Sequence, residues 1–272
     1  MSFKDVAEVR RRIELIPATS QKMAFIASYL FCARIGEIVS IKLPGDVEAN
    51  PTGSQLDVVK EVYIPNINNP LEFQTLSLSM MVQTLKPVDL SEIMKIKEPV
   101  AIFTVATEKR MGWKREVALP LNPKFEPWAK PLYEYMVERK KEKLTVFPFH
   151  RQEMHKWSRI IFKGLQYKIQ PYRRAVMNGK QYTYDEKKRL IQSVVVDHTR
   201  SFATHALRHL RDSELRNFYG FSGEDRALYG GWTLRTTTGM GSSSQERYGE
   251  GGWRIYFPKL LKKSVYYKEK VK

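Results

Sequence analysis

The spacing of apolar residues changes twice along this chain and constrains its fold more than any other feature. Residues 3–16 carry apolar side chains at intervals typical of a helix with one buried face. A second helix is expected to begin at Thr19 or Ser20 and to reach Ile38. From about 55 to 121 the spacing shortens toward the period of strands. Further helices are predicted near residues 127–142, 150–166, 200–218 and 224–230.

The β-rich part predicts one strand and one hairpin. The strand is expected over residues 58–64. Residues 100–105 and 116–119 flank a basic turn that contains Gly112, which is typical of a hairpin. A Gly/Ser/Thr-rich loop is expected at 236–244. Together these patterns predict an α+β fold, mainly α, with a small antiparallel β-sheet inserted early.

The charge of the chain is unusually basic. Lysine and arginine number 46 against 29 acidic residues, which gives a formal net charge of +17. A field of this sign attracts polyanions, nucleic acid in particular and an anionic membrane surface less readily. The alternative is a charged surface that serves solubility or thermal stability.

The sequence predicts a protein of the cytoplasm. Its one cysteine, Cys32, allows no intramolecular disulfide and lies in an apolar run, where a buried thiol is expected. That run is shorter than the roughly 20 residues that cross a bilayer. The first residues lack the hydrophobic segment of a signal peptide. We therefore expect a cytoplasmic, DNA-associated (nucleoid) protein with no membrane partner.

The segment His205-Ala206-Leu207-Arg208-His209 carries the strongest chemical signal. His205 and Arg208 lie three residues apart on an expected helix and project from one face, where they can meet a single phosphate. Alone, the pair also fits a structural role, with salt bridges and a buried histidine. His205 and His209 have the spacing of a zinc pair, but Arg208 stands between them and no third ligand is near in sequence. We expect no metal and no small-molecule cofactor.

Together with other residues this segment can carry out phosphodiester chemistry. Arg34 and Arg208 can stabilise the negative charge that builds on the non-bridging oxygens. Tyr248 can act as the nucleophile, and Lys109 on the basic turn can protonate the leaving oxygen. The indole N–H of Trp232 is a further donor. Lys114 is the alternative general acid, and solvated surface is the alternative role for both lysines.

These residues, in this order, resemble the tyrosine recombinases, the phage- and archaeal-type integrases of the DNA breaking-rejoining fold. The segment 32–38 looks like the first-arginine box of the family, with Arg34 as phosphate clamp and Glu37 as its acidic support. Residues 107–109 and 115–119 are similar to the catalytic-lysine hairpin. The segment 205–209 is close to the His-x-x-Arg box.

Two downstream positions complete the resemblance. Trp232 falls in the next box, where most family members carry histidine and some carry tryptophan. Tyr248 falls where the nucleophile is expected, although the interval from Trp232 is longer than in relatives, and Tyr256 is the alternative. The resemblance implies cleavage and rejoining of DNA through a 3′-phosphotyrosyl intermediate, with His205 assisting proton transfer and His209 supporting it.

The resemblance also implies partners and a domain organisation. Double-stranded DNA is the expected substrate and a homo-oligomer on DNA the expected working unit. Residues 1–257 are assigned to the catalytic domain, and the basic segment 258–272 to a tail that docks on a neighbour or frays. A type IB topoisomerase and a non-catalytic basic DNA-binding protein are the alternative functions. The residues expected to contact DNA phosphates, or else to be solvated surface, are Arg110, Lys114, Arg115, Arg173, Arg174 and Arg200.

Overall fold

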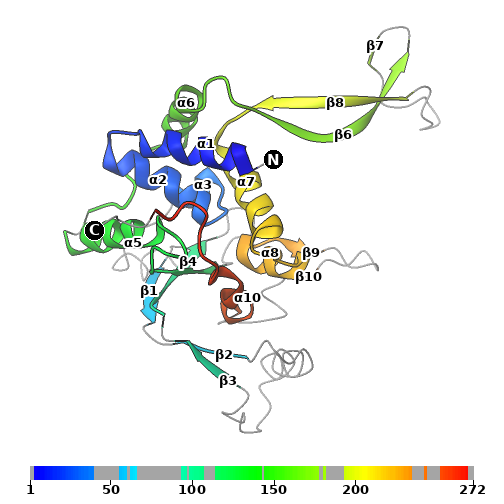
Figure 1. Ribbon diagram of the computed structural model, residues 1–272. Helices are drawn as coiled ribbons and strands as arrows, with labels where there is room; N and C mark the ends of the chain where they lie inside the picture. The colour runs from blue at the N-terminus through cyan, green and yellow to red at the C-terminus, as the bar shows by residue number, and fades with distance from the viewer. Residues whose placement is uncertain are drawn as a thin grey trace.

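The computed structural model describes residues 3–39, 55–59, 62–65, 93–96, 98–106, 114–142, 144–177, 180–181, 193–234, 242–243 and 252–268. Its helices are α1 (Phe3–Glu14), α2 (Thr19–Leu30), α3 (Ile35–Val39), α5 (Ala129–Lys141), α6 (Arg151–Ile161), α7 (Thr204–Asn217), α8 (Gly223–Gly230) and α10 (Trp253–Leu260). Its strands are β1 (Gln55–Val59), β2 (Val62–Pro65), β3 (Ile93–Ile96), β4 (Val100–Ala106), β5 (Lys114–Pro120), β6 (Gln166–Met177), β7 (Lys180–Gln181), β8 (Ser193–Ser201), β9 (Thr233–Leu234) and β10 (Ser242–Ser243). The architecture is α+β, with more described residues in helices than in strands (Figure 1).

Helix α2 forms the centre of the core. Every residue from Met23 to Leu30 is buried, as expected of a helix that is apolar on all sides and surrounded by other elements. Helices α1, α5 and α7 pack against it. The predicted continuation to Ile38 is wrong, because Cys32 adopts a φ of +51°, a backbone conformation that no right-handed helix contains. The chain turns there and resumes as α3.

The predicted hairpin is confirmed by β4 and β5, which pair antiparallel with Val105 opposite Arg115. Strand β1 adds to the other edge of β4. The single strand predicted over 58–64 is wrong, because β1 pairs with β4 whereas β2 pairs with β3. Helices α8 and α10 contact β5, which joins this sheet to the helical core.

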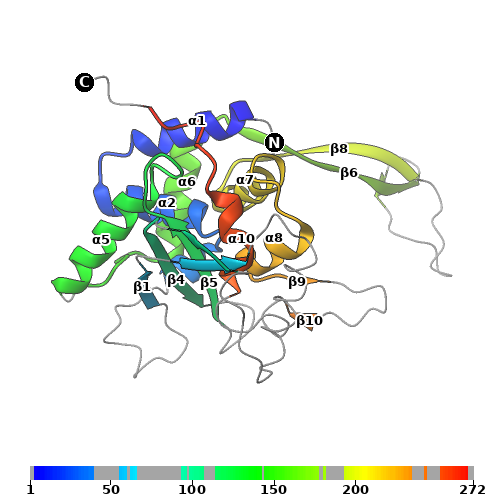
Figure 2. The ribbon, with the colours of Figure 1, turned by 60° about the horizontal axis from the view of Figure 1, so that its bottom comes forward.

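A long two-stranded ribbon, β6 paired with β8, separates α6 from α7 and was not predicted from the sequence. It shortens both helices expected there, since Gln166 already belongs to β6 and residues 200–201 to β8. Pro171 lies where the β6–β8 register shifts, the kind of position that tolerates a residue without a backbone N–H. Figures 1 and 2 both show β6 and β8 extending away from the helices.

The segment after residue 257 packs on its own domain along its described part. Pro258 lies inside α10, so the domain boundary predicted at 257/258 cuts a helix and is wrong. Further on, the Ser264 backbone N–H donates to the Lys124 carbonyl oxygen at 2.8 Å. The Tyr266 ring lies over the Arg10 guanidinium, with 4.4 Å from Cζ to the ring centroid. No helix within the described ranges is both long and apolar enough to cross a membrane.

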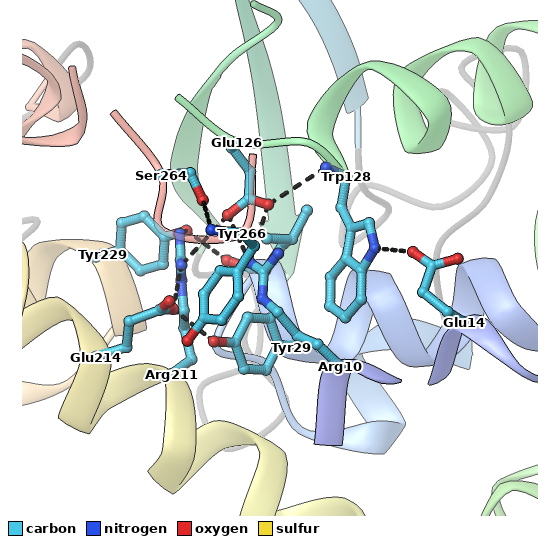
Figure 3. Close-up of polar contacts among 11 residues, drawn as sticks. Arg10, Glu14, Tyr29, Glu126, Trp128, Arg211, Glu214, Tyr229, Ser264 and Tyr266 are labelled. Carbon is cyan, nitrogen blue, oxygen red and sulfur yellow. Dashed lines mark hydrogen bonds and ion pairs between the residues drawn. The ribbon is translucent and has the colours of Figure 1, made fainter. Parts of the chain in front are cut away.

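A buried ionic network ties both ends of the described chain to the core (Figure 3). Nη2 of Arg10 donates to both carboxylate oxygens of Glu126, at 2.9 and 2.8 Å. Arg211 donates to Glu214 at 2.6 Å and lies 3.5 Å from Glu126. The Tyr29 hydroxyl donates to Glu214 at 2.5 Å. Charges so far from water require such pairing, so the network fixes how α1, α2 and α7 meet.

Candidate active site

A single buried carboxylate, that of Glu37 on α3, organises the predicted site. It accepts hydrogen bonds from the Arg34 backbone N–H at 3.0 Å and from the Arg34 guanidinium at 3.1 Å. Arg115 donates at 3.1 Å to Oε2, the oxygen that also accepts from the Arg34 backbone N–H, and Nη1 of Arg208 lies 3.9 Å from the same oxygen. Burial alone would raise the pKa of Glu37, but Arg115, the Arg34 N–H and Arg208 outweigh it and hold that pKa below its ordinary value. Glu37 therefore stays ionised and gathers three arginines.

Arg115 is one of these three, and its expected role as a DNA contact is wrong. Its side chain is 2% exposed. Besides Glu37, it donates to the Phe31 carbonyl oxygen at 3.0 Å and to the Tyr229 carbonyl oxygen at 3.1 Å. These carbonyls lie at the C-terminal ends of α2 and α8, where helices leave acceptors without intrahelical partners. Arg115 is therefore a structural clamp near the turn end of the paired strands β4 and β5.

Arg208 on α7 is buried and only partly satisfied. Its Nη2 donates to the Gly230 carbonyl oxygen at 3.1 Å, whereas its Nη1 has no hydrogen-bond partner within the described part of the chain. Burial, with repulsion from Arg115 and Arg34, lowers the pKa of Arg208 to about 10, against the attraction of Cys32 and Glu37. The group remains a cation at neutral pH, and an anion that paired with it would relieve this cost.

Trp232 covers Arg208 from the end of α8. The Arg208 Cζ lies 5.1 Å from the centroid of the half-buried indole ring, within reach of a cation–π interaction. The ring also packs on Gly230, where a Cβ atom would lie 2.7 Å from it, so only glycine fits there. Ser222 caps the other end of α8 by accepting from the Asp225 N–H at 3.1 Å, which fixes the helix that presents these groups.

His205 and His209 lie on the exposed side of α7, one turn apart, with ring centroids 4.6 Å from each other. Partial desolvation, together with the charges of His209, Arg208, Arg34 and Arg200, lowers the pKa of His205 to about 4. Desolvation also lowers the pKa of His209. Across the described ranges no group of three or more His, Cys, Asp or Glu side chains is placed to hold a metal ion. The histidine pair thus offers neutral proton acceptors beside two arginines.

The protonation of His205 gives a direct test of this electrostatic environment. We expect the His205 ring to titrate near pH 4, so that it stays neutral from pH 7 down to pH 5. Replacing Arg200 with glutamine should raise this pKa, since Arg200 is one of the repelling charges. NMR titration of the histidine ring protons measures both values, with the His205 signal identified by its loss in His205→Gln. Lys130→Gln on α5 is the control, and an equal shift in both variants would contradict this account.

The structure brings together only part of the predicted set. The predicted residues that lie together, as described above, are Arg34, Glu37, His205, Arg208, His209 and Trp232. Lys109, Arg110 and Tyr248 lie outside the described residues. Lys114, Arg173 and Arg174 are described only as strand positions, opposite Ala106, Val195 and Val194. Arg200 is exposed on β8, beside the histidine pair.

Tyr256, the alternative nucleophile, is a core residue. It is fully buried, and its hydroxyl donates to the Glu116 carbonyl oxygen and accepts from the Ala118 N–H, both at 3.0 Å. Burial raises its pKa well above the ordinary value for tyrosine. A nucleophile needs access to the phosphate and an accessible phenolate, and Tyr256 has neither.

Chemically, the described groups form a cationic cluster of a kind that suits a tetrahedral anion. Two arginines, from α7 and from the turn before α3, approach one carboxylate, the indole of Trp232 lies against one of them, and a neutral imidazole is near both. Comparison with other proteins finds no relative of this chain. No family model matches it, and neither does any curated protein or solved structure.

Proposed function

We propose that this chain is a site-specific DNA recombinase of the tyrosine type, built on the DNA breaking-rejoining fold. The observation that carries the proposal is the convergence of Arg34 and Arg208 on one buried carboxylate, with neutral His205 beside them. Paired guanidinium groups held in fixed positions are what a phosphodiester requires as charge grows on its non-bridging oxygens. The basic composition of the chain supports DNA as the substrate.

The proposed reaction is a pair of transesterifications. The Tyr248 oxygen attacks the scissile phosphorus, forming a bond between tyrosine and the 3′-phosphate while the bond to the 5′-oxygen breaks. His205 assists removal of the phenol proton, and Lys109 gives a proton to the 5′-oxygen. The 5′-hydroxyl of a partner strand then attacks the phosphotyrosine and releases Tyr248. Each bond broken is replaced by one of the same kind, so the reaction needs no energy source.

Arg208 contributes to this reaction through its Nη1, which has no partner among the described residues. That N–H is buried and ready to donate, so a phosphate oxygen can take the place of a missing partner. The indole of Trp232, whose ring centroid lies 5.1 Å from the Arg208 Cζ, is near enough to contact the same phosphate. In the proposed working state a homo-oligomer assembles on duplex DNA in the nucleoid, so that two cleaved strands can exchange ends.

Covalent trapping tests the proposal. The full chain is incubated with a pool of nicked duplexes whose sequence is randomised around the nick, so that the 5′-hydroxyl fragment diffuses away after cleavage. We expect a protein–DNA adduct that survives denaturing electrophoresis with the wild type and is absent with Tyr248→Phe. Absence of an adduct with the wild type would sink the enzymatic proposal, and an adduct with Tyr248→Phe would sink the choice of nucleophile.

Tyr256→Phe is the matched control for that experiment. It removes one buried hydroxyl and its two backbone hydrogen bonds, which costs about 1–3 kcal/mol of stability. It should nevertheless form the adduct. The target sequences recovered from the adduct are then used as substrates to separate the two catalytic alternatives. Strand exchange between two marked duplexes supports a recombinase. Relaxation of supercoiled DNA without exchange supports a type IB topoisomerase.

A further inference from the structure

The β6–β8 ribbon stands out because it is long and leaves the body of the protein (Figure 2). Strand β6 has 12 residues. At about 3.4 Å per residue it reaches roughly 40 Å. Two-stranded ribbons are marginally stable alone in water, and both views show no described helix alongside its outer part (Figures 1 and 2). Its outer part is therefore a surface that a partner can cover.

The base of the ribbon is anchored beside the candidate site. The Phe202 N–H donates to the Leu165 carbonyl oxygen at 2.9 Å, and the Phe202 ring packs on Phe162 with centroids 4.9 Å apart. The Tyr167 ring lies 6.3 Å from the His209 ring. A duplex that places a phosphate at His205 and Arg208 must therefore pass the base of the ribbon.

The charge and register of the ribbon fit a polyanion on either side. Its two long strands carry four cations, Lys168, Arg173, Arg174 and Arg200, against one carboxylate, Asp197. Arg174 of β6 lies opposite Val194 of β8, and Arg200 of β8 lies opposite Tyr167 of β6. Positions 194 and 200 of β8 are an even number of residues apart, so positions 174 and 200 belong to one face of the ribbon. Arg173 and Lys168 pair with Val195 and Thr199, which belong to the opposite face. The four cationic positions are thus divided between the two faces of the ribbon.

We propose that the β6–β8 ribbon is a DNA-binding arm that enters the major groove of the duplex flanking the cleavage site. The major groove is about 12 Å wide and admits a two-stranded ribbon, with phosphates on both sides of it. The reach of the ribbon corresponds to about one helical turn, or roughly 10 base pairs. The position of the arm relative to the cleavage site rests on the proposed function, whereas its binding to DNA does not.

The test compares two variants of the full chain that each remove two positive charges. Arg173→Gln/Arg174→Gln changes the ribbon, and Lys130→Gln/Lys141→Gln changes α5, on the opposite side of the body (Figure 1). Binding to a mixed-sequence duplex of about four helical turns, roughly 40 base pairs, is titrated over a range of salt concentrations. We expect the ribbon variant to bind about tenfold more weakly and to lower the slope of log Kd against log salt by about 1.8, or 0.9 for each phosphate contact. The α5 variant should match the wild type, and both variants should unfold at the wild-type temperature.

A second measurement places the arm on the DNA. Cys32 is buried, so a DNA-cleaving reagent attached to Val194→Cys on β8 labels the ribbon selectively. In the covalent adduct we expect cuts about one helical turn, roughly 10 base pairs, from the phosphotyrosine. Cuts only within the first few base pairs, or none, would place the ribbon away from the groove.

The outcomes of the two proposals are distinguishable. If the wild type forms the adduct and the two double variants bind DNA equally, the arm is refuted while the recombinase proposal stands. If no adduct forms but the ribbon variant alone weakens DNA binding, the DNA-binding arm is supported and the recombinase proposal is refuted. If the ribbon variant changes only the self-association of the DNA-free chain, measured by sedimentation, the ribbon contacts a second copy and the proposal is overturned.

Discussion

Replacing Arg208 with glutamine is expected to slow formation of the covalent adduct about 10³-fold, the typical cost of removing a fixed donor from a developing oxyanion. The reason is that Arg208 carries a charge that burial destabilises, and its Nη1 has no hydrogen-bond partner among the described residues. Its removal should cost little stability, since Glu37 keeps hydrogen bonds to Arg34 and Arg115. Single-turnover adduct formation, followed with the selected target duplex, measures the rate, and thermal unfolding measures the stability.

Two further variants make this result specific. Arg208→Lys keeps the charge but loses the planar fork, and we expect it to recover about tenfold of the lost rate. Arg226→Gln on α8 is the matched control, because it removes a half-buried arginine that pairs with Asp212 at 2.9 Å outside the site. It should leave the rate unchanged. Equal rates for Arg208→Gln and Arg226→Gln would reduce Arg208 to a structural residue.

Replacing Glu126 with glutamine is expected to lower the free energy of unfolding by about 3–5 kcal/mol, the usual cost of breaking a buried ion pair. Glu126 is 2% exposed and neutralises Arg10 through both of its oxygens. Arg211 lies 3.5 Å from the same carboxylate, so the substitution leaves two buried guanidinium groups with less counter-charge. Equilibrium unfolding in urea measures the change.

Glu8→Gln is the control for the ionic network. Glu8 also pairs with two arginines, Arg11 and Arg12, at 2.8 and 2.7 Å, but on the exposed side of α1. Water already solvates those charges, so the effect on the urea midpoint should be several times smaller. Similar losses for Glu8→Gln and Glu126→Gln would mean that burial does not set the strength of this network.

The parts of the fold that were predicted correctly are those governed by local periodicity. The β4–β5 hairpin and helices α1, α5 and α8 follow from the spacing of apolar residues within one segment. The alternation of side chains along a strand also indicates that Arg115 is buried, because it lies on the same face of β5 as Val117 and Leu119, which are both buried. Arg115 was instead predicted to contact DNA, because it directly follows the basic turn.

The parts that were missed depend on partners far away in the chain. Strand β6 contains Pro171 and three cations, a composition that argues against a strand, and it is stabilised by pairing with β8 and, at its end, with β7. The partner of Arg10 lies 116 residues away, and that of Tyr29 185 residues away, so no local pattern identifies them. The order of the sequence motifs predicted that Arg34, His205 and Arg208 lie near one another, and the structure brings them together. Their roles in catalysis, like those of Lys109 and Tyr248, remain predictions.

The cover that Tyr266 gives to Arg10 has a consequence for how the protein is made. The ring that lies 4.4 Å from the Arg10 Cζ is synthesised more than two hundred residues after α1. Until then the guanidinium is exposed to water on that face, and contacts of such long sequence separation form slowly. The nascent chain therefore completes this part of its core only after Tyr266 has been translated, and the incompletely packed chain is prone to aggregation until then.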